Sequence, residues 1–160
     1  MKCYNELTCS TLPEIQKESL LWINTHKDEM IPYEGDFWYK INSIDFIQNC
    51  PSVVSYCQSL DLKLREVAVL IAEDRNGVPL HTDEGPLISK LNIPILNTKN
   101  TITHWYDNNN NLLDSLEVIK PIIFNSSIPH KVKINENAQL PRIVLACMFF
   151  NDPIDYLKND

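Results

Sequence analysis

The first part of the chain spaces its apolar residues as amphipathic helices do. A helix is predicted from Thr11 to Thr25, because Pro13 stands in its first turn and apolar side chains then recur at helical intervals. Two shorter helices are predicted at Ser43–Asn49 and Ser52–Leu60. We therefore expect residues 1–62 to be mostly helical and to pack on the rest of the chain.

From Lys63 onward the pattern changes to short runs of β-branched and aromatic residues bounded by turn residues. No helical pattern interrupts these runs, which disfavours parallel βαβ winding and favours two antiparallel sheets. The predicted strands are Leu64–Ala72, Val78–Asp83, Ser89–Asn97, Thr101–Tyr106, Leu112–Ile119, Ile122–Asn125, His130–Ile134 and Arg142–Phe150. The pattern thus predicts one mainly β domain with N-terminal helices: a jelly-roll core at 63–150 and a C-terminal tail at 151–160.

Charge and cysteine content narrow the function classes. The chain has 160 residues and a formal charge of −7, so nucleic acid is not expected as a tight general partner, nor is a membrane surface. The cluster of Lys131 and Lys133 leaves open an enzyme that acts on a single base. Five cysteines without a C-x-x-C pair, and an N-terminus without an apolar run, favour a cytoplasmic protein. The oligomeric state stays open.

Two of the four histidines stand in a setting that suits a metal ion. His81 and Asp83 lie two residues apart in a predicted strand, so their side chains point to the same face. His130 opens a later strand and completes a set of two histidines and one carboxylate if the sheets bring these strands together. Such a facial triad leaves metal positions open and suits non-haem Fe(II) chemistry.

Arg142 is the second unusual residue. It begins the last predicted strand, directly before the apolar run Ile143–Ala146. A guanidinium in a strand that otherwise belongs to the core is costly to bury unless it pairs with a carboxylate. The sequence therefore predicts an anionic partner for Arg142, from the protein or from a ligand.

The order His81-x-Asp83, His130 and Arg142 resembles that of the Fe(II)- and 2-oxoglutarate-dependent oxygenases. In that superfamily a double-stranded β-helix, a cupin-like jelly roll, carries an H-x-D pair, a distal histidine and then an arginine. The resemblance extends over residues 64–150 and includes Leu91–Asn97 and Ile122–His130.

The resemblance implies that His81, Asp83 and His130 bind Fe(II) as the catalytic centre, and that Arg142 binds the distal carboxylate of the cosubstrate 2-oxoglutarate. It also implies a dioxygenase that hydroxylates a small polar molecule or an amino-acid or peptide side chain while 2-oxoglutarate is decarboxylated to succinate. The subfamily and the substrate itself stay open.

One position departs from the family's pattern. Many members have a serine or threonine two residues after the arginine, where this chain has Val144. A polar side chain from another strand is then needed to share the carboxylate. The candidates are Asn92, Thr101, Thr103 and Tyr106, of which Asn92 and Thr103 are assigned to the cosubstrate site.

Two other interpretations fit the same residues. In a cupin-type enzyme the three ligands hold iron, manganese or zinc, and Arg142 binds a carboxylate of the substrate itself. In a non-catalytic jelly-roll binding protein, Arg142 pairs with an internal acid and no metal binds tightly.

Two aromatic segments are candidates for the walls of a substrate site. His104 and Tyr106 lie on a predicted strand of the core. The segment Tyr33–Lys40 combines Phe37, Trp38 and Tyr39 with a glycine, which suggests a lid over the site.

Overall fold

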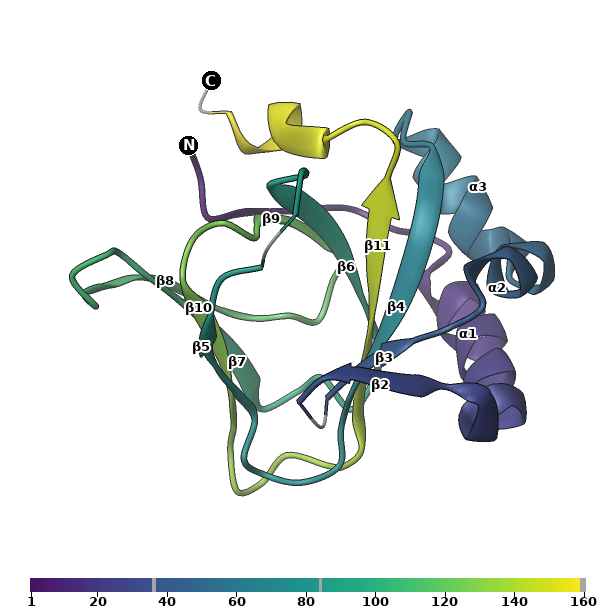
Figure 1. The fold of residues 1–160 in the computed structure, drawn as a ribbon, viewed down its shortest axis with the longest axis horizontal. Helices are drawn as coiled ribbons and strands as arrows, with labels where there is room; N and C mark the ends of the chain where they lie inside the picture. The colour runs from purple at the N-terminus through teal and green to yellow at the C-terminus, as the bar shows by residue number, and fades with distance from the viewer. Residues whose placement is uncertain (36, 84, 159–160) are drawn as a thin grey trace.

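The computed structural model describes residues 1–35, 37–83 and 85–158. Two antiparallel sheets face each other, and the helices cover the outer face of the larger sheet (Figure 1). In order across it, the larger sheet contains β1 (Tyr4–Glu6), β9 (Ile122–Asn125), β6 (Ser89–Leu96), β11 (Arg142–Phe149), β4 (Leu64–Ala72), β3 (Trp38–Lys40) and β2 (Ile31–Glu34).

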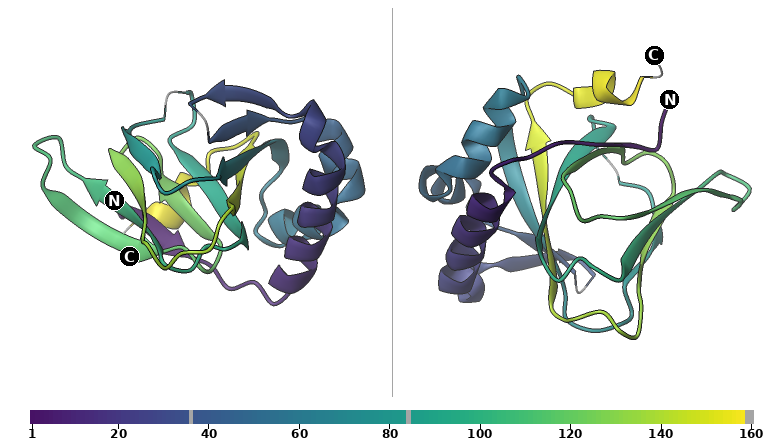
Figure 2. Two further views of the ribbon diagram at one scale, coloured as in Figure 1. Left: turned by 90° about the horizontal axis from the view of Figure 1, so that it is seen from below. Right: turned by 180° about the vertical axis from the view of Figure 1, so that it is seen from behind.

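The smaller sheet has the order β5 (Val78–His81), β10 (His130–Ile134), β7 (Thr101–Tyr106) and β8 (Leu112–Glu117). The hairpin of β7 and β8 projects from the side opposite the helices (Figures 1 and 2). Asp107 closes its turn, since its carboxylate accepts hydrogen bonds from the backbone N–H groups of Asn109 and Asn111. The chain therefore forms two facing layers with a space between them.

The helices are α1 (Leu12–His26), α2 (Ser43–Asn49) and α3 (Pro51–Ser59), with 3₁₀ turns η1 (Lys27–Glu29) and η2 (Pro153–Leu157). Proline occupies the first turn of both α1 and α3, where its missing N–H costs nothing. Among the described residues, no helix has the length and apolar character needed to cross a bilayer.

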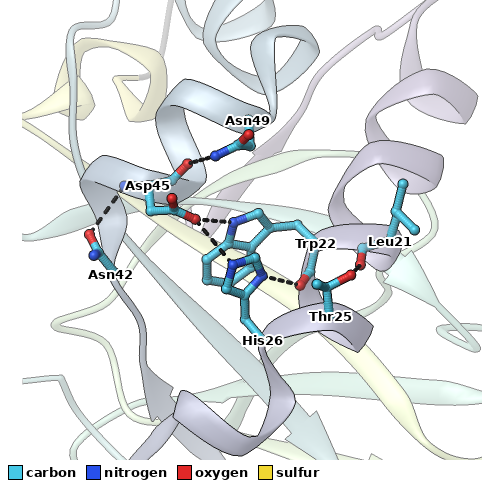
Figure 3. A network of polar contacts seen from close by, with 7 residues as sticks. All are labelled: Leu21, Trp22, Thr25, His26, Asn42, Asp45 and Asn49. Carbon is cyan, nitrogen blue, oxygen red and sulfur yellow. Dashed lines mark hydrogen bonds and ion pairs between the residues drawn. The ribbon is translucent and has the colours of Figure 1, made fainter.

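Asp45 ties α1 to α2 (Figure 3). Its Oδ2 accepts a hydrogen bond from Trp22 Nε1 at 2.7 Å and lies 3.3 Å from His26 Nε2. The rings of Trp22 and His26 stack with centroids 4.1 Å apart. The backbone N–H of Asp45 is in turn held by the Asn42 side chain, which caps α2. One carboxylate therefore fixes the packing of two helices behind the sheet.

The central strands of the larger sheet carry large apolar residues on the face toward the helices, and two paired alanines on the other face. In β4, Val67, Val69 and Ile71 belong to the core shared with the helices. The alternate positions face the smaller sheet, where Ala68 in β4 and Ala146 in β11 replace large side chains. These small residues leave the space between the sheets in which the candidate site lies.

The predicted elements of the core agree closely with the observed ones. All eight predicted core strands begin at the predicted residue. Four end where predicted and four end one or two residues early, as β5 does at His81 instead of Asp83. The N-terminal part differs more, because β1, β2 and β3 were not predicted. The predicted lid Tyr33–Lys40 contains most of the β2–β3 hairpin at the edge of the larger sheet; its residue Asp36 lies outside the described residues.

Candidate active site

His81 and His130 are brought together by strand pairing. They are register partners in the antiparallel pair β5–β10, and their ring centroids lie 4.4 Å apart. Asp83 follows β5 directly, and its backbone N–H donates to the carbonyl of Ser126. Ligand atoms of His81, Asp83 and His130 all lie within 4.8 Å of one another. The structure thus assembles the three predicted ligands in one place.

Both imidazoles present the same ring nitrogen to this cluster. Nδ1 of His81 donates to the carbonyl of Pro79, and Nδ1 of His130 donates to the carbonyl of Ile128, each at 2.8 Å. A neutral ring with its proton on Nδ1 has its lone pair on Nε2, the arrangement found in metal-binding histidines. His81 Nε2 lies 3.3 Å from Asp83 Oδ1, so a proton or a metal ion is needed between these two atoms.

The electrostatic surroundings keep Asp83 ionised. Burial acts to raise its pKa, but the hydrogen bond with His81 and the ammonium of Lys90 outweigh it and bring the pKa down to about 2. Lys90 Nζ lies 2.9 Å from Asp83 Oδ2. For His130, burial lowers the pKa, and this favours the neutral ring that a metal ion requires.

Arg142 lies in the same pocket as the three ligands, between the two sheets. Its residue is 4% exposed, and its Nε donates to Thr101 Oγ1 at 3.1 Å. Burial lowers the pKa of Arg142 to about 10, so the guanidinium remains charged at neutral pH. In the described part of the chain, no carboxylate forms an ion pair with it. A buried cation without a carboxylate partner calls for an anionic ligand.

The pocket has about 530 Å³ of space between atoms, solvent at its mouth included. Its walls come from both sheets. The smaller sheet contributes Thr103 and Trp105, and the larger one contributes Leu70, Asn92 and Ala146.

Comparison of sequences gives no relative for this chain: no family model matches it, and neither does any curated protein. Comparison of structures, in contrast, finds similar proteins. A Pseudomonas putida prolyl-4-hydroxylase superposes with a TM-score of 0.58 at 11% identity, over 93% of this chain and 92% of that one. The non-heme alpha ketoglutarate dependent epimerase SnoN from nogalamycin biosynthesis gives 0.60 at 10% identity, over 91% and 76%.

A prolyl hydroxylase from Trichoplax adhaerens, in complex with a peptide fragment of the hypoxia inducible factor oxygen degradation domain, gives a TM-score of 0.57 at 15% identity. The match covers 99% of this chain and 87% of that one. The chain has the double-stranded β-helix fold of the 2-oxoglutarate-dependent oxygenases. At these identities the likeness shows the fold, and the site has to be argued from its own residues.

Within this double-stranded β-helix, both residues assigned to the cosubstrate line the pocket. Asn92 and Thr103 face it from β6 and β7. Asn92 Oδ1 is buried and has no hydrogen-bond partner among the described residues. Val144, at the position that departs from the family's pattern, is fully buried. The hydroxyl that contacts Arg142 comes from Thr101 on another strand, one of the candidates for this role.

The expectation that His104 and Tyr106 line the site is wrong. Side chains of β7 alternate between faces, and Thr101, Thr103 and Trp105 are the buried ones. His104 instead contacts the hydroxyl of Ser115 on β8 at 2.7 Å, outside the pocket.

Two pocket residues, Trp105 and Lys90, were not among the site residues predicted from the sequence. Trp105 is fully buried beside His130 in register, and its Nε1 has no partner in the described part of the chain. Thr103 was assigned to the cosubstrate site, and Trp105 shares its face of β7 because side chains alternate along a strand. Lys90 was missed although it is a cation in a strand of the core, the same signal that singled out Arg142.

The aromatic segment of the predicted lid divides between two environments. Phe37 and Trp38 line the pocket, and the Phe37 ring lies 6.1 Å from that of His81. Tyr39 packs against the main hydrophobic core instead. The β2–β3 hairpin therefore contributes one wall of the site.

Proposed function

We propose that the chain is an Fe(II)- and 2-oxoglutarate-dependent dioxygenase that hydroxylates a small polar molecule or an amino-acid or peptide side chain. The observation that carries the proposal is the charge arrangement of a single pocket. His81, Asp83 and His130 stand together in it, and Arg142 is buried in it without a carboxylate partner in the described residues. A ligand with a keto acid that chelates the metal and a second carboxylate that pairs with Arg142 would fit this arrangement.

The three ligands fit Fe(II) by their chemistry. Two neutral imidazoles and one carboxylate form the set that non-haem iron oxygenases use, and this set leaves positions open for other ligands. The carbonyls of Pro79 and Ile128 fix the orientation of the rings from outside the cluster. His81, Asp83 and His130 would hold the metal.

Arg142 fits the distal carboxylate of 2-oxoglutarate. A guanidinium binds carboxylates through two parallel hydrogen bonds, and Arg142 uses only its Nε toward Thr101. The alternative of an internally paired arginine finds no support in the described residues. Thr103 and Asn92, which line the pocket from the two facing sheets, would bind the rest of the cosubstrate.

When bound, iron and 2-oxoglutarate would allow molecular oxygen to act as the oxidant: one oxygen atom would enter succinate, formed with carbon dioxide from the cosubstrate, and the other would enter the hydroxylated substrate. The chain itself binds, orients and shields. Arg142 and the histidines set the position of the cosubstrate, since holding reactants in register lowers the entropic part of the barrier. Leu70, Ala146 and Phe124 form apolar walls that limit access of water to the site.

The similar structures differ in what they act on, and this supports a broad substrate class. One holds a peptide fragment, and another belongs to an epimerase of nogalamycin biosynthesis. One fold can host several reactions, so the fold does not choose the reaction. We propose hydroxylation because two of the similar structures are prolyl hydroxylases.

Succinate formation tests the proposal. The purified protein is incubated with Fe(II), ascorbate, oxygen and 2-oxoglutarate, with and without a panel of amino acids and peptides, and succinate is measured. We expect succinate from the wild type and none above background from His81→Ala, Asp83→Ala or His130→Ala. His104→Ala is the matched control, because His104 lies outside the pocket and its loss should change nothing. Equal succinate from wild type and triad variants would refute the proposal.

A further inference from the structure

Lys90 occupies an unusual position beside the three proposed ligands. It lies on β6, its residue is 7% exposed, and its Nζ is 2.9 Å from Asp83 Oδ2. The other oxygen of this carboxylate, Oδ1, faces His81 Nε2 at 3.3 Å. The two oxygens of Asp83 are thus divided between a lysine and the centre of the cluster.

The fold by itself does not require a lysine at this position. Lys90 is the register partner of Phe124, a buried apolar residue of β9, and both line the same pocket. Burying an ammonium costs free energy that an apolar side chain would not cost. Two contacts offset this cost: the ion pair with Asp83 and the ring of Trp38, whose centroid lies 4.9 Å from Nζ.

We propose that Lys90 is a positioning residue that holds Asp83 as a single-oxygen ligand and so sets the number of metal positions left for the cosubstrate. The inference rests on the proposed function, because it concerns the way in which Asp83 meets the metal. The ammonium occupies Oδ2, and this leaves Oδ1 as the ligand atom on the side of the histidines.

The way in which Asp83 binds determines how many coordination positions of the metal remain for the cosubstrate. Two imidazoles and one carboxylate oxygen fill three positions of an octahedral metal, whereas a carboxylate bound through both oxygens fills a fourth. A chelating keto acid takes two positions and a further small ligand takes one. With Oδ2 released from Lys90, the carboxylate competes with the keto acid for the metal.

Lys90 also links the metal ligand to the wall of the pocket. Trp38 belongs to β3 and lines the pocket together with Lys90. The same ammonium therefore contacts both the carboxylate and the hairpin that covers it. Replacement of Lys90 is expected to change the emission of Trp38 as well as the ligand sphere.

The test uses Co(II) in place of Fe(II), because its visible spectrum reports coordination and needs no turnover. For Lys90→Met we expect Co(II) binding to persist with a changed visible spectrum, and the affinity of the Co(II) protein for 2-oxoglutarate to fall at least about tenfold, the size typical of lost partners of metal ligands. For Lys90→Arg, which keeps a cation that donates to a carboxylate, we expect both properties to remain within about threefold of wild type.

The matched control is Lys131→Met. Lys131 is also a strand lysine over an aromatic ring, that of Tyr106 at 5.0 Å, but it does not line the pocket. We expect it to leave the spectrum and the 2-oxoglutarate affinity unchanged. Lys90→Gln, a polar replacement without charge, is measured by the same criterion if Lys90→Met does not fold.

The outcomes separate this inference from the proposed function. If the wild type binds neither Co(II) nor 2-oxoglutarate, the proposed function fails. If the wild type binds both and a folded Lys90 variant without charge keeps the wild-type spectrum and affinity, Lys90 only neutralises a buried acid and the inference alone is overturned.

Discussion

His81 and His130 lie opposite each other on the paired strands β5 and β10, with ring centroids 4.4 Å apart. This single register brings together two residues that are far apart in the sequence. A slip of β5 by one residue would turn His81 to the other face of the sheet, because side chains alternate along a strand. The proposed metal site therefore depends on the residues that fix the register of β5.

Gly77 is the residue next to β5 that we expect to fix this register. It has φ +68°, and a Cβ there would lie 2.2 Å from the carbonyl oxygen of Val132 on β10. Gly77→Ala is thus expected to push β5 away from β10, to lower the free energy of unfolding by about 2 kcal/mol or more, and to weaken metal binding. Chemical denaturation and Co(II) titration measure the two effects. Unchanged metal binding in a destabilised variant would show that the register is fixed elsewhere.

Replacement of Arg142 should affect ligand binding and stability in opposite ways. Arg142→Met removes a buried charge without a carboxylate partner in the described residues, so the ligand-free protein should be as stable as the wild type or more stable. Loss of its hydrogen bonds to the cosubstrate should weaken 2-oxoglutarate binding by about 2–4 kcal/mol. Calorimetric titration and thermal unfolding check both.

Arg75 supplies the contrast for this experiment. It donates hydrogen bonds to the carbonyls of Glu136 and Ala138 and does not line the pocket, so Arg75→Met should reduce stability and leave 2-oxoglutarate affinity unchanged. If Arg142→Met instead destabilises the ligand-free protein and keeps its affinity, Arg142 is a structural residue.

Ala146 lies on the wall of the pocket, where its small size leaves room for a ligand. Ala146→Leu should fill this room, so cosubstrate binding should be lost while metal binding remains. The cost of the larger side chain should stay within the ~1–3 kcal/mol seen when cores are overpacked. Retained 2-oxoglutarate affinity in the folded variant would place the cosubstrate elsewhere.

Asp45 should matter for stability alone. Asp45→Asn removes the charge that holds Trp22 and His26 together, and we expect a loss of about 1–2 kcal/mol in the free energy of unfolding. The exposed residue Asp28 gives the control Asp28→Asn, which should cost little. An effect of Asp45→Asn on 2-oxoglutarate affinity as large as its effect on stability would contradict a purely structural role.

The sequence predicted the core strands well because their apolar runs are long and end at clear turn residues. It did not predict β1, β2 and β3, which have three or four residues each. These segments become strands through pairing with β9 and β4, and such pairing depends on neighbours distant in sequence.

The candidate site was predicted in the same uneven way. The motif gave His81, Asp83, His130 and Arg142 by residue type and order. It did not give Lys90, because the contact of its ammonium with Asp83 is formed by chain folding across strands. His104 was placed on the wrong face because the aromatic content of β7 was considered without its alternation.

An anaerobic titration of the purified protein with Fe(II) and then 2-oxoglutarate tests whether iron and the cosubstrate bind together in this pocket. We expect the weak visible metal-to-ligand charge-transfer band of a keto acid chelated to Fe(II) in the wild type, and its absence in both His130→Ala and Arg142→Ala. Iron binding without the band would contradict the role of 2-oxoglutarate, and failure to bind iron would contradict the metal site itself.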